Sequence, residues 1–308
     1  MTPDAARRRT PHAAHLFVPA TRADLTAKAV RSAATAVILD LEDSVTASEK
    51  AAAREALAEA AATVRAGGKH VCVRVNNSPD LLDDDVRAAL AAGADGLVVP
   101  KVEDVELLRR LDRQITEWED GREDGRVERD SVELELQVET PRGLLVAPET
   151  ATAVRRTTSM MLGVEDFSTA LGVDPDDPDG DLSWAHGRLL MAAAAADLWA
   201  YGLIGAFSNF RDLEAYTTSV RRSRAFGYVG AYCIHPAQAE IAARGFAPSD
   251  EEVDRARRVV RAYAEAEAGG QSATSVDGAM VDRPIAERAQ RLLDRAAATT
   301  TPPTKDQP

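Results

Sequence analysis

Eight short apolar segments recur along this 308-residue chain, and most of them end in a charged or polar residue. Stretches rich in Ala, Leu, Arg and Glu separate most of these segments, so that predicted strands alternate with predicted helices. The alternation predicts a parallel sheet, and eight strands suggest a closed (β/α)8 barrel of the TIM type, in which the carboxyl ends of the strands surround the active site. The eight segments are residues 15–19, 36–40, 71–76, 96–101, 134–139, 159–163, 202–207 and 231–235.

The two ends of the chain differ from its middle, because they are polar, rich in Pro and without periodicity. We expect a disordered N-terminus over residues 1–12, a barrel over 13–268, a helical C-terminal lid over 275–298 and a disordered tail over 299–308. A Gly/Ser-containing link near residue 270 favours mobility of the lid. A charged, Gly-broken loop over 119–126 is predicted to lie in solvent. The expected helices are residues 23–34, 47–66, 82–92, 102–117, 185–200, 211–226, 250–268 and 284–297.

Composition excludes several classes of protein. The net charge of −13 argues against a nucleic-acid partner, which requires a basic surface. No apolar run is long enough to span a membrane, and no secretory signal opens the chain, so we expect a cytoplasmic protein without a membrane partner. Cys72 and Cys233 fall inside predicted buried strands, as structural thiols do. The five histidines lack the short spacings that are typical of zinc sites.

Two carboxylates are expected to meet at the carboxyl edge of the sheet. Glu139 ends the fifth predicted strand and Asp166 follows the sixth. Because neighbouring parallel strands lie about 4.8 Å apart, these side chains can converge on one point. Two carboxylates are the usual protein contribution to a Mg²⁺ site. The alternative is that both residues cap the helices that follow them, since acidic residues favour helix N-termini.

A second polar group follows the second predicted strand. Asp40 and Glu42 would share one face if the strand persists, whereas Asp43 is favoured as a helix cap. Arg74 lies inside an otherwise apolar strand, and a buried arginine needs a partner. That partner is either Glu42 or an acid group of a substrate, because the guanidinium fork suits a carboxylate.

Seven segments of the chain together resemble the HpcH/HpaI aldolase and citrate lyase superfamily, and most closely its citrate lyase beta-subunit-like CoA-ester lyases. The resemblance covers about residues 13–297. It implies a TIM barrel with a C-terminal lid, Mg²⁺, and cleavage or formation of a carbon–carbon bond at a coenzyme A thioester. The segments are residues 16–20, 38–45, 73–76, 99–101, 138–140, 163–167 and 233–238.

The resemblance also implies roles for individual residues. Glu139 and Asp166 would bind Mg²⁺, and Arg74 would hold the keto-acid portion of the substrate. Glu42 would lie beside Arg74 and would either support it without touching the substrate or handle a proton. Lys28 and Lys101 would lie near the coenzyme A phosphates.

The segment 278–284 resembles the lid motif of the family, which places an aspartate in the site of a neighbouring subunit. The corresponding residue here is Asp282. It would act as the general acid within a homo-oligomer, most simply a trimer. The alternative is that Asp282 only caps the helix that begins near Pro284.

The expected function is therefore that of a Mg²⁺-dependent carbon–carbon lyase. Its substrate would be a short 3-hydroxyacyl-CoA with a second carboxylate, of the malyl-CoA or citramalyl-CoA kind, and its products a keto acid and acetyl-CoA or a homologue. Gly205 and the Pro141-Arg142 pair depart from the family pattern near the pocket, which leaves the particular substrate open. The alternatives are a beta subunit of citrate lyase, a pyruvate aldolase that does not use coenzyme A, and a non-catalytic binding subunit.

Overall fold

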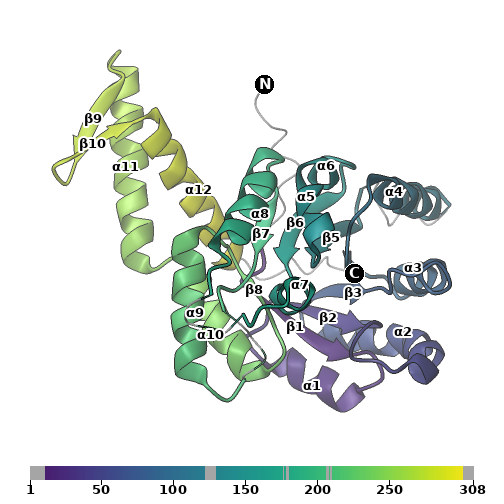
Figure 1. Cartoon of the computed structure of the whole chain (residues 1–308). Helices are drawn as coiled ribbons and strands as arrows, with labels where there is room; N and C mark the ends of the chain where they lie inside the picture. The colour runs from purple at the N-terminus through teal and green to yellow at the C-terminus, as the bar shows by residue number, and fades with distance from the viewer. Residues whose placement is uncertain are drawn as a thin grey trace. The chain divides into compact units, whose positions relative to one another are not determined.

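The computed structural model describes residues 11–121, 130–175, 177, 180–205, 208 and 210–300 (Figure 1). The chain divides into two compact units, Met1–Phe246 and Ala247–Pro308. Of the ends predicted to be disordered, residues 1–10 and 301–308 lie outside the described residues. Among the described residues, no helix is both long and apolar enough to cross a membrane.

The first unit is the predicted barrel of eight parallel strands, which pair in the order β7-β6-β5-β4-β3-β2-β1-β8. A bridge between Tyr201 and Gly230 joins the two remaining edges, and the amide of Gly202 donates to the Gly230 carbonyl at 3.1 Å. The predicted fold class is confirmed. The strands are β1 (Ala14–Pro19), β2 (Ala36–Asp40), β3 (His70–Arg74), β4 (Gly96–Val99), β5 (Glu133–Val138), β6 (Thr157–Leu162), β7 (Trp199–Tyr201) and β8 (Ala231–Cys233).

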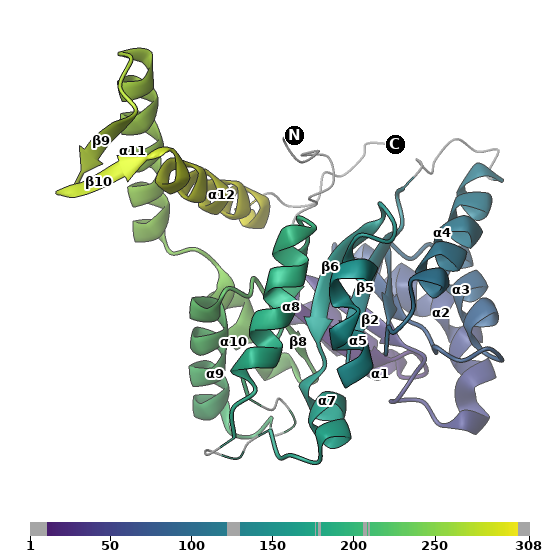
Figure 2. The same ribbon diagram turned by 45° about the horizontal axis from the view of Figure 1, so that its top comes forward.

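Helices surround the strands of this unit (Figure 2). The short helices α5, α6 and α7 were not predicted from the sequence, because a helix of one or two turns shows little periodicity. The longer helix α10 was also not predicted. The helices are α1 (Ala23–Arg31), the 3-10 turn η2 (Ala47–Glu49), α2 (Lys50–Ala66), α3 (Leu82–Ala91), α4 (Val105–Asp120), α5 (Pro141–Leu145), α6 (Ala147–Ala151), α7 (Val164–Leu171), α8 (Ser183–Ala195), α9 (Leu213–Phe226) and α10 (Pro236–Phe246).

Side chains alternate between two apolar clusters. Val37 and Leu39 of β2 pack outward against the helices, whereas Ala36 and Ile38 belong to a smaller cluster inside the barrel. The inner cluster also includes residues from β3, β4, β6, β7 and β8. This double burial explains why the strands read as continuous apolar runs, as they do in parallel sheets.

Strand seven was predicted at the wrong place. The strand is Trp199–Tyr201 and not residues 202–207, of which 206 and 207 lie outside the described residues. The preceding helix ends at Ala195, five residues before the predicted end. Asp197 has a positive φ of 60°, which stops the helix although the alanines before it favour its continuation.

The charged loop predicted over residues 119–126 is also corrected in part. Glu119 lies in the last turn of α4 and is buried, with its carboxylate 3.2 Å from the guanidinium of Arg156. The same carboxylate accepts hydrogen bonds from the amides of Ser131 and Val132, at the start of β5. Glu119 is therefore a buried residue that binds Arg156 and the segment before β5, and not a solvated loop residue. Residues 122–126 lie outside the described part of the chain.

The second unit contains α11 (Asp250–Ala268), a hairpin of β9 (Ala273–Val276) and β10 (Ala279–Asp282), and α12 (Arg283–Thr300). The final predicted helix is thus present, whereas α11, expected as part of the barrel domain, groups with this unit. The expected flexible link leads into the hairpin. Asp277 and Gly278 at its turn both have positive φ, as a type I′ hairpin turn requires.

Candidate active site

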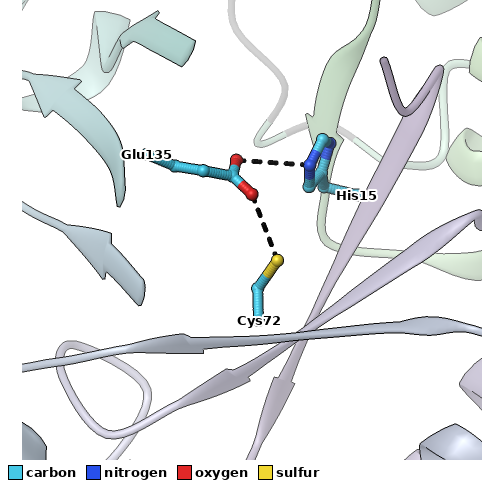
Figure 3. Close-up of side chains that lie close together, drawn as sticks. All are labelled: His15, Cys72 and Glu135. Atoms are coloured by element: carbon cyan, nitrogen blue, oxygen red, sulfur yellow. Dashed lines mark hydrogen bonds and ion pairs between the residues drawn. The ribbon is translucent and has the colours of Figure 1, made fainter. Parts of the chain in front are cut away.

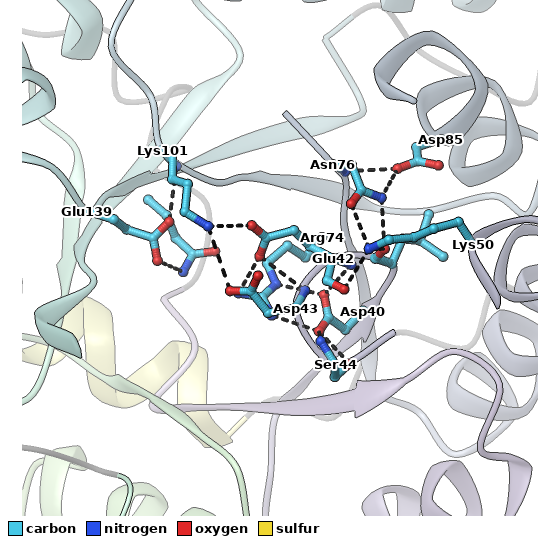
Figure 4. Close-up of polar contacts among 12 residues, drawn as sticks. Asp40, Glu42, Asp43, Ser44, Lys50, Arg74, Asn76, Asp85, Lys101 and Glu139 are labelled. Carbon is cyan, nitrogen blue, oxygen red and sulfur yellow. Dashed lines mark hydrogen bonds and ion pairs between the residues drawn. The ribbon is translucent and has the colours of Figure 1, made fainter. Parts of the chain in front are cut away.

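A polar cluster lies at the carboxyl ends of β2, β3 and β4 and the start of the segment after β5 (Figure 4). Arg74, the last residue of β3, is at its centre and is 8% exposed. Its Nη1 lies 3.0 Å from Glu42 Oε2, and its guanidinium carbon lies 4.5 Å from the centre of the Phe17 ring. The cation–π contact and the carboxylate together compensate for the burial of the arginine charge.

Asp40 is the closest partner of Arg74, a role that the sequence analysis did not assign. Its two carboxylate oxygens accept hydrogen bonds from Arg74 Nε and Nη2, each at 2.7 Å. They also accept from the amides of Glu42 and Ser44, which shapes the turn after β2. Burial alone would raise the pKa of Asp40, but the hydrogen bonds and charge of Arg74 lower it overall. The Nε–Nη2 edge of the Arg74 guanidinium group is therefore occupied by Asp40.

Lys101 connects the acidic groups. Its Nζ lies 2.7 Å from Glu42 Oε1 and 3.6 Å from Asp166 Oδ2, and its amide donates to Glu139 Oε2 at 3.1 Å. A positive φ of 50° lets the backbone and the ammonium group face the same cluster. Asp43, expected as a helix cap, is instead exposed, with an oxygen 3.7 Å from Lys101 Nζ.

Of the two lysines predicted to lie near the coenzyme A phosphates, Lys101 belongs to this cluster and Lys28 does not. The ammonium group of Lys101 is paired with carboxylates, so a contact with coenzyme A phosphates stays a prediction. Lys28 is exposed in the last turn of α1. Because α1 starts at the carboxyl edge and runs away from it, the structure does not bring Lys28 into the cluster.

Glu139 is the most strongly perturbed carboxylate of the cluster. It is 4% exposed and accepts a hydrogen bond from Gln137 Nε2 at 3.1 Å. Burial, with the negative charges of Asp166 and Glu42, raises the pKa of Glu139 to about 7, although Arg74 and Lys101 oppose the shift. Burial also raises the pKa of Glu42. Carboxylates forced together in this way form a site that a cation would stabilise.

Asp166 approaches Glu139 from the first turn of α7, and its side chain is 43% exposed. Both carboxylates lie near Lys101, Glu139 buried and Asp166 open to solvent, and their joint binding of a metal stays a prediction. Gly163, the residue before α7, lies against the side chain of Glu139. A Cβ at this position would come within 2.5 Å of Glu139 Cγ and 2.6 Å of its Oε1, so the carboxylate occupies the space that any other side chain would need.

We expect Gly163→Ala to displace the Glu139 carboxylate and to lower kcat/KM by about 10²-fold, the usual effect of a small misplacement in an active site. The far-ultraviolet circular dichroism spectrum should not change. Gly187→Ala in α8 is the matched control, since a Cβ there meets nothing within 4 Å. Equal activity of the two variants would show that Gly163 does not position Glu139.

A second network holds the turn that carries Glu42. Lys50 Nζ donates to the carbonyls of Leu41 and Glu42 and to Asn76 Oδ1, at 2.7, 2.8 and 2.8 Å. Asn76 Nδ2 in turn donates to Asp85 Oδ2 at 2.6 Å. This role of Lys50 could not be predicted from the sequence, because nothing in a helical pattern shows that its ammonium group turns back to the strand end.

The two departures from the family pattern have local explanations. Gly205 has a φ of 107°, a conformation that favours glycine. Pro141 is the first residue of α5, where proline is favoured, and the side chain of Arg142 is 78% exposed.

Comparison with known protein families and structures supports the resemblance. A family model described as HpcH/HpaI aldolase/citrate lyase matches residues 13–236. The chain is 32% identical to the citrate lyase subunit beta of Leuconostoc mesenteroides over 287 residues, which covers 92% of each protein. It is also 32% identical over 305 residues to an L-malyl-CoA/beta-methylmalyl-CoA lyase of Cereibacter sphaeroides, covering 93% of this chain and 95% of that protein.

A solved structure extends the similarity to three dimensions. CitE from Mycobacterium tuberculosis, crystallised in complex with magnesium, acetoacetate and coenzyme A, superposes with a TM-score of 0.70 at 30% identity. The match covers 94% of this chain and 99% of that one.

Proposed function

This chain belongs to the HpcH/HpaI aldolase/citrate lyase family, and from that premise we propose that it is a Mg²⁺-dependent carbon–carbon lyase acting on CoA thioesters. The substrate that we propose is a short 3-hydroxyacyl-CoA with a second carboxylate, of the malyl-CoA or citramalyl-CoA kind. The observation that carries the proposal is the convergence of Glu139, Asp166 and Glu42 beside Arg74 and Lys101. Such a site offers charge of both signs to a carboxylate substrate and to its reacting oxygen.

The residues present fit a magnesium ion. Glu139 and Asp166 offer hard oxygen donors, which Mg²⁺ prefers, and the raised pKa of Glu139 reflects negative charge that a cation would neutralise. Gly163 leaves the space in which the Glu139 carboxylate sits. When bound, Mg²⁺ would supply Lewis-acid stabilisation of the oxygen that becomes negative in the reaction.

The chain's own groups account for the remaining chemistry. Asp40 accepts hydrogen bonds from the Nε edge of the Arg74 guanidinium group, whereas Nη1 faces Glu42. The Nη1 group would bind the keto-acid portion of the substrate. Glu42 would accept the proton of the substrate hydroxyl. The bond between the hydroxyl-bearing carbon and the carbon next to the thioester then breaks, and its electron pair passes into the thioester as an enolate. A general acid returns a proton to that carbon and releases the acyl-CoA.

A second candidate is a beta subunit of citrate lyase, which the sequence identities support as well as they support the first. The citrate lyase subunit beta and the malyl-CoA lyase are equally identical to this chain, at 32%. The identities therefore do not separate a free CoA thioester from a thioester on an acyl carrier. The carboxylate cluster suits both substrates, because they share a hydroxyl group and a carboxylate.

A screen of thioesters tests the proposal. The protein is incubated with Mg²⁺ and malyl-CoA, citramalyl-CoA, citryl-CoA, a citryl acyl carrier or a free hydroxy-oxo acid, and the released keto acid is measured. We expect turnover of malyl-CoA or citramalyl-CoA that EDTA abolishes. Turnover of the acyl-carrier substrate alone would favour the citrate lyase subunit, and turnover of the free acid alone a pyruvate aldolase. No turnover and no Mg²⁺-dependent thermal shift would favour a binding subunit.

Replacement of Arg74 by Lys should reduce kcat/KM although the charge is retained. Lysine cannot engage Asp40 with two hydrogen bonds and also face Glu42, so the charge beside the substrate is misplaced. We expect a loss of about 2–4 kcal/mol in transition-state stabilisation, similar to the loss of one oxyanion donor. Arg87→Lys on the exposed surface of α3 is the control, and equal kinetics of the two variants would make Arg74 structural only.

We further propose that Asp282 is the general acid and acts in the site of a neighbouring subunit, within a trimer. Its Oδ1 accepts a hydrogen bond from the amide of Ile285 at 3.3 Å, so it does cap α12, the alternative role expected from the sequence. The two roles are compatible, because a cap uses one carboxylate oxygen and leaves the second for proton transfer.

Mixed oligomers test this cross-subunit role. Asp282→Asn and Glu139→Gln should each be inactive alone, whereas co-expressed chains should regain activity at sites that combine an intact barrel with an intact lid. In a cyclic assembly with equal amounts of both chains, about a quarter of the sites are complete. Mixed oligomers verified by mass spectrometry but without activity would show that the lid serves its own barrel, or that Asp282 is only a cap.

A further inference from the structure

A second group of polar side chains lies buried inside the barrel, and Figure 3 shows its three members close together. It consists of His15, Cys72 and Glu135, which are 0%, 0% and 2% exposed. They come from β1, β3 and β5, and alternate strands of a (β/α)8 barrel contribute to the same interior layer. Arg74 lies two residues further along β3 than Cys72, which is about 6.6 Å of strand. The interior group is therefore a separate site.

The distances within this group suit metal coordination. Cys72 Sγ lies 3.1 Å from Glu135 Oε1, and His15 Nε2 lies 3.3 Å from Glu135 Oε2. One ligand atom from each residue lies within 4.8 Å of the others. Zinc bonds of about 2.0–2.3 Å place tetrahedral ligand atoms about 3.3–3.8 Å apart. The His15–Glu135 separation lies at the lower end of this range, and the Cys72 sulfur would move away from Glu135 by about half an ångström on binding.

The imidazole of His15 is the second observation that indicates a ligand. Although the ring is fully buried, neither of its nitrogens has a hydrogen-bond partner among the described residues. Its Nε2 is near the Glu135 carboxylate but is not aligned with it for a hydrogen bond. A buried polar group without a partner is unfavourable, so most such groups in native proteins are satisfied by a side chain, a water molecule or an ion.

We propose that His15, Cys72 and Glu135 bind one Zn²⁺ ion inside the barrel. A thiolate and an imidazole favour zinc over magnesium, which prefers oxygen ligands. The charges also balance, because Zn²⁺ with one thiolate, one carboxylate and one neutral imidazole has no net charge, which suits a buried site. On binding, the Cys72 sulfur exchanges its proton for the metal, and the proton leaves to solvent.

The surroundings support the same assignment. The hydroxyl of Tyr232 donates to Glu135 Oε2 at 2.7 Å, as residues beside metal sites do when they orient a ligand. The rings of Tyr201 and Tyr232 lie 4.6 and 4.8 Å from that of His15, and so enclose it. Because all three ligands are buried, the metal must enter while the chain folds. The sequence spacing gave no sign of this site, because the ligands lie on three different strands.

The test is refolding of the full chain in the presence of Zn²⁺, or of Co²⁺ as a spectroscopic probe, followed by desalting against EDTA. We expect about one retained metal per chain and, with Co²⁺, the near-ultraviolet charge-transfer band of a cobalt–thiolate bond. Cys72→Ala should lose both signals. Cys233→Ala is the matched control, since it removes the other buried thiol, which contacts Tyr216 and not this group.

Two further variants separate this site from the carboxyl-edge cluster. Glu139→Gln should retain the metal and the thiolate band, whereas Glu135→Gln should lose them. If Cys72→Ala does not refold, Cys72→Ser replaces it in the same comparison. The absence of retained zinc in the wild-type protein, or a thiolate band that persists without Cys72, would overturn the proposal. Neither result depends on the lyase activity.

Discussion

Replacement of Glu139 by Gln is expected to abolish turnover and to leave the fold intact. The amide can keep the hydrogen bond with Gln137, but it removes one of the two negative charges that would hold Mg²⁺. Loss of the metal should cost several kcal/mol of transition-state stabilisation, which corresponds to at least about 10³-fold in kcat. Asp166→Asn should have the same effect.

The measurement is kcat with saturating Mg²⁺, together with circular dichroism of each variant. Glu149→Gln, the same substitution at an exposed position of α6, is the control and should retain activity. If Glu139→Gln or Asp166→Asn keeps near-normal Mg²⁺-dependent activity, then the proposed ligands are wrong.

Glu139→Gln should also stabilise the metal-free protein at neutral pH. The folded-state pKa of Glu139 is raised to about 7, so between pH 4.5 and 7 the folded state binds more protons than the unfolded state. The free energy of unfolding therefore falls as the pH rises through this window, by on the order of 3 kcal/mol in total. Glu139→Gln should lack this decrease. Urea unfolding in EDTA at both ends of the window tests it, and identical pH dependence of the two proteins would contradict the raised pKa.

The sequence predicted most of the barrel because a parallel sheet buries both faces of its strands. Seven of the eight predicted apolar segments overlap an observed strand. Strand seven failed, since Trp199–Tyr201 is only three residues long and follows an alanine-rich helix whose propensity continues past its true end. A short strand beside a strong helix former gives no period that a pattern can detect.

The site could be predicted only to the level of residues at strand ends. Glu42, Arg74, Glu139 and Asp166 do lie together, because the carboxyl ends of parallel strands meet at one edge. The role of Asp40 as the main partner of Arg74 could not be predicted. It depends on whether Asp40 or Glu42 lies closer to the guanidinium group, and the sequence does not show this. Asp40 and Arg74 are paired as the last residues of β2 and β3, but this register is a property of the folded sheet, and the predicted third strand extended to residue 76.

Loss of the Asp40 carboxylate should be among the most destabilising single changes in the barrel. Asp40 is fully buried, and its oxygens accept from Arg74 and from the amides of Glu42 and Ser44. Removal of one partner of a buried ion pair typically costs about 3–5 kcal/mol, because the other charge stays in the interior. Glu42 still pairs with Arg74 Nη1, so we expect Asp40→Asn to fall near the lower end of that range.

The matched control for Asp40→Asn is Asp43→Asn, because Asp43 is also near Arg74, at 4.0 Å, but its side chain is 60% exposed. Chemical unfolding should show a large loss for the first variant and almost none for the second. The double variant Asp40→Asn/Arg74→Met should then recover part of the stability, since no uncompensated charge remains. Equal stability of Asp40→Asn and the wild-type protein would mean that Glu42 alone is a sufficient partner. In that case the arginine would be held by the residue that we propose to handle the proton, and the two functions could not be separated by mutation.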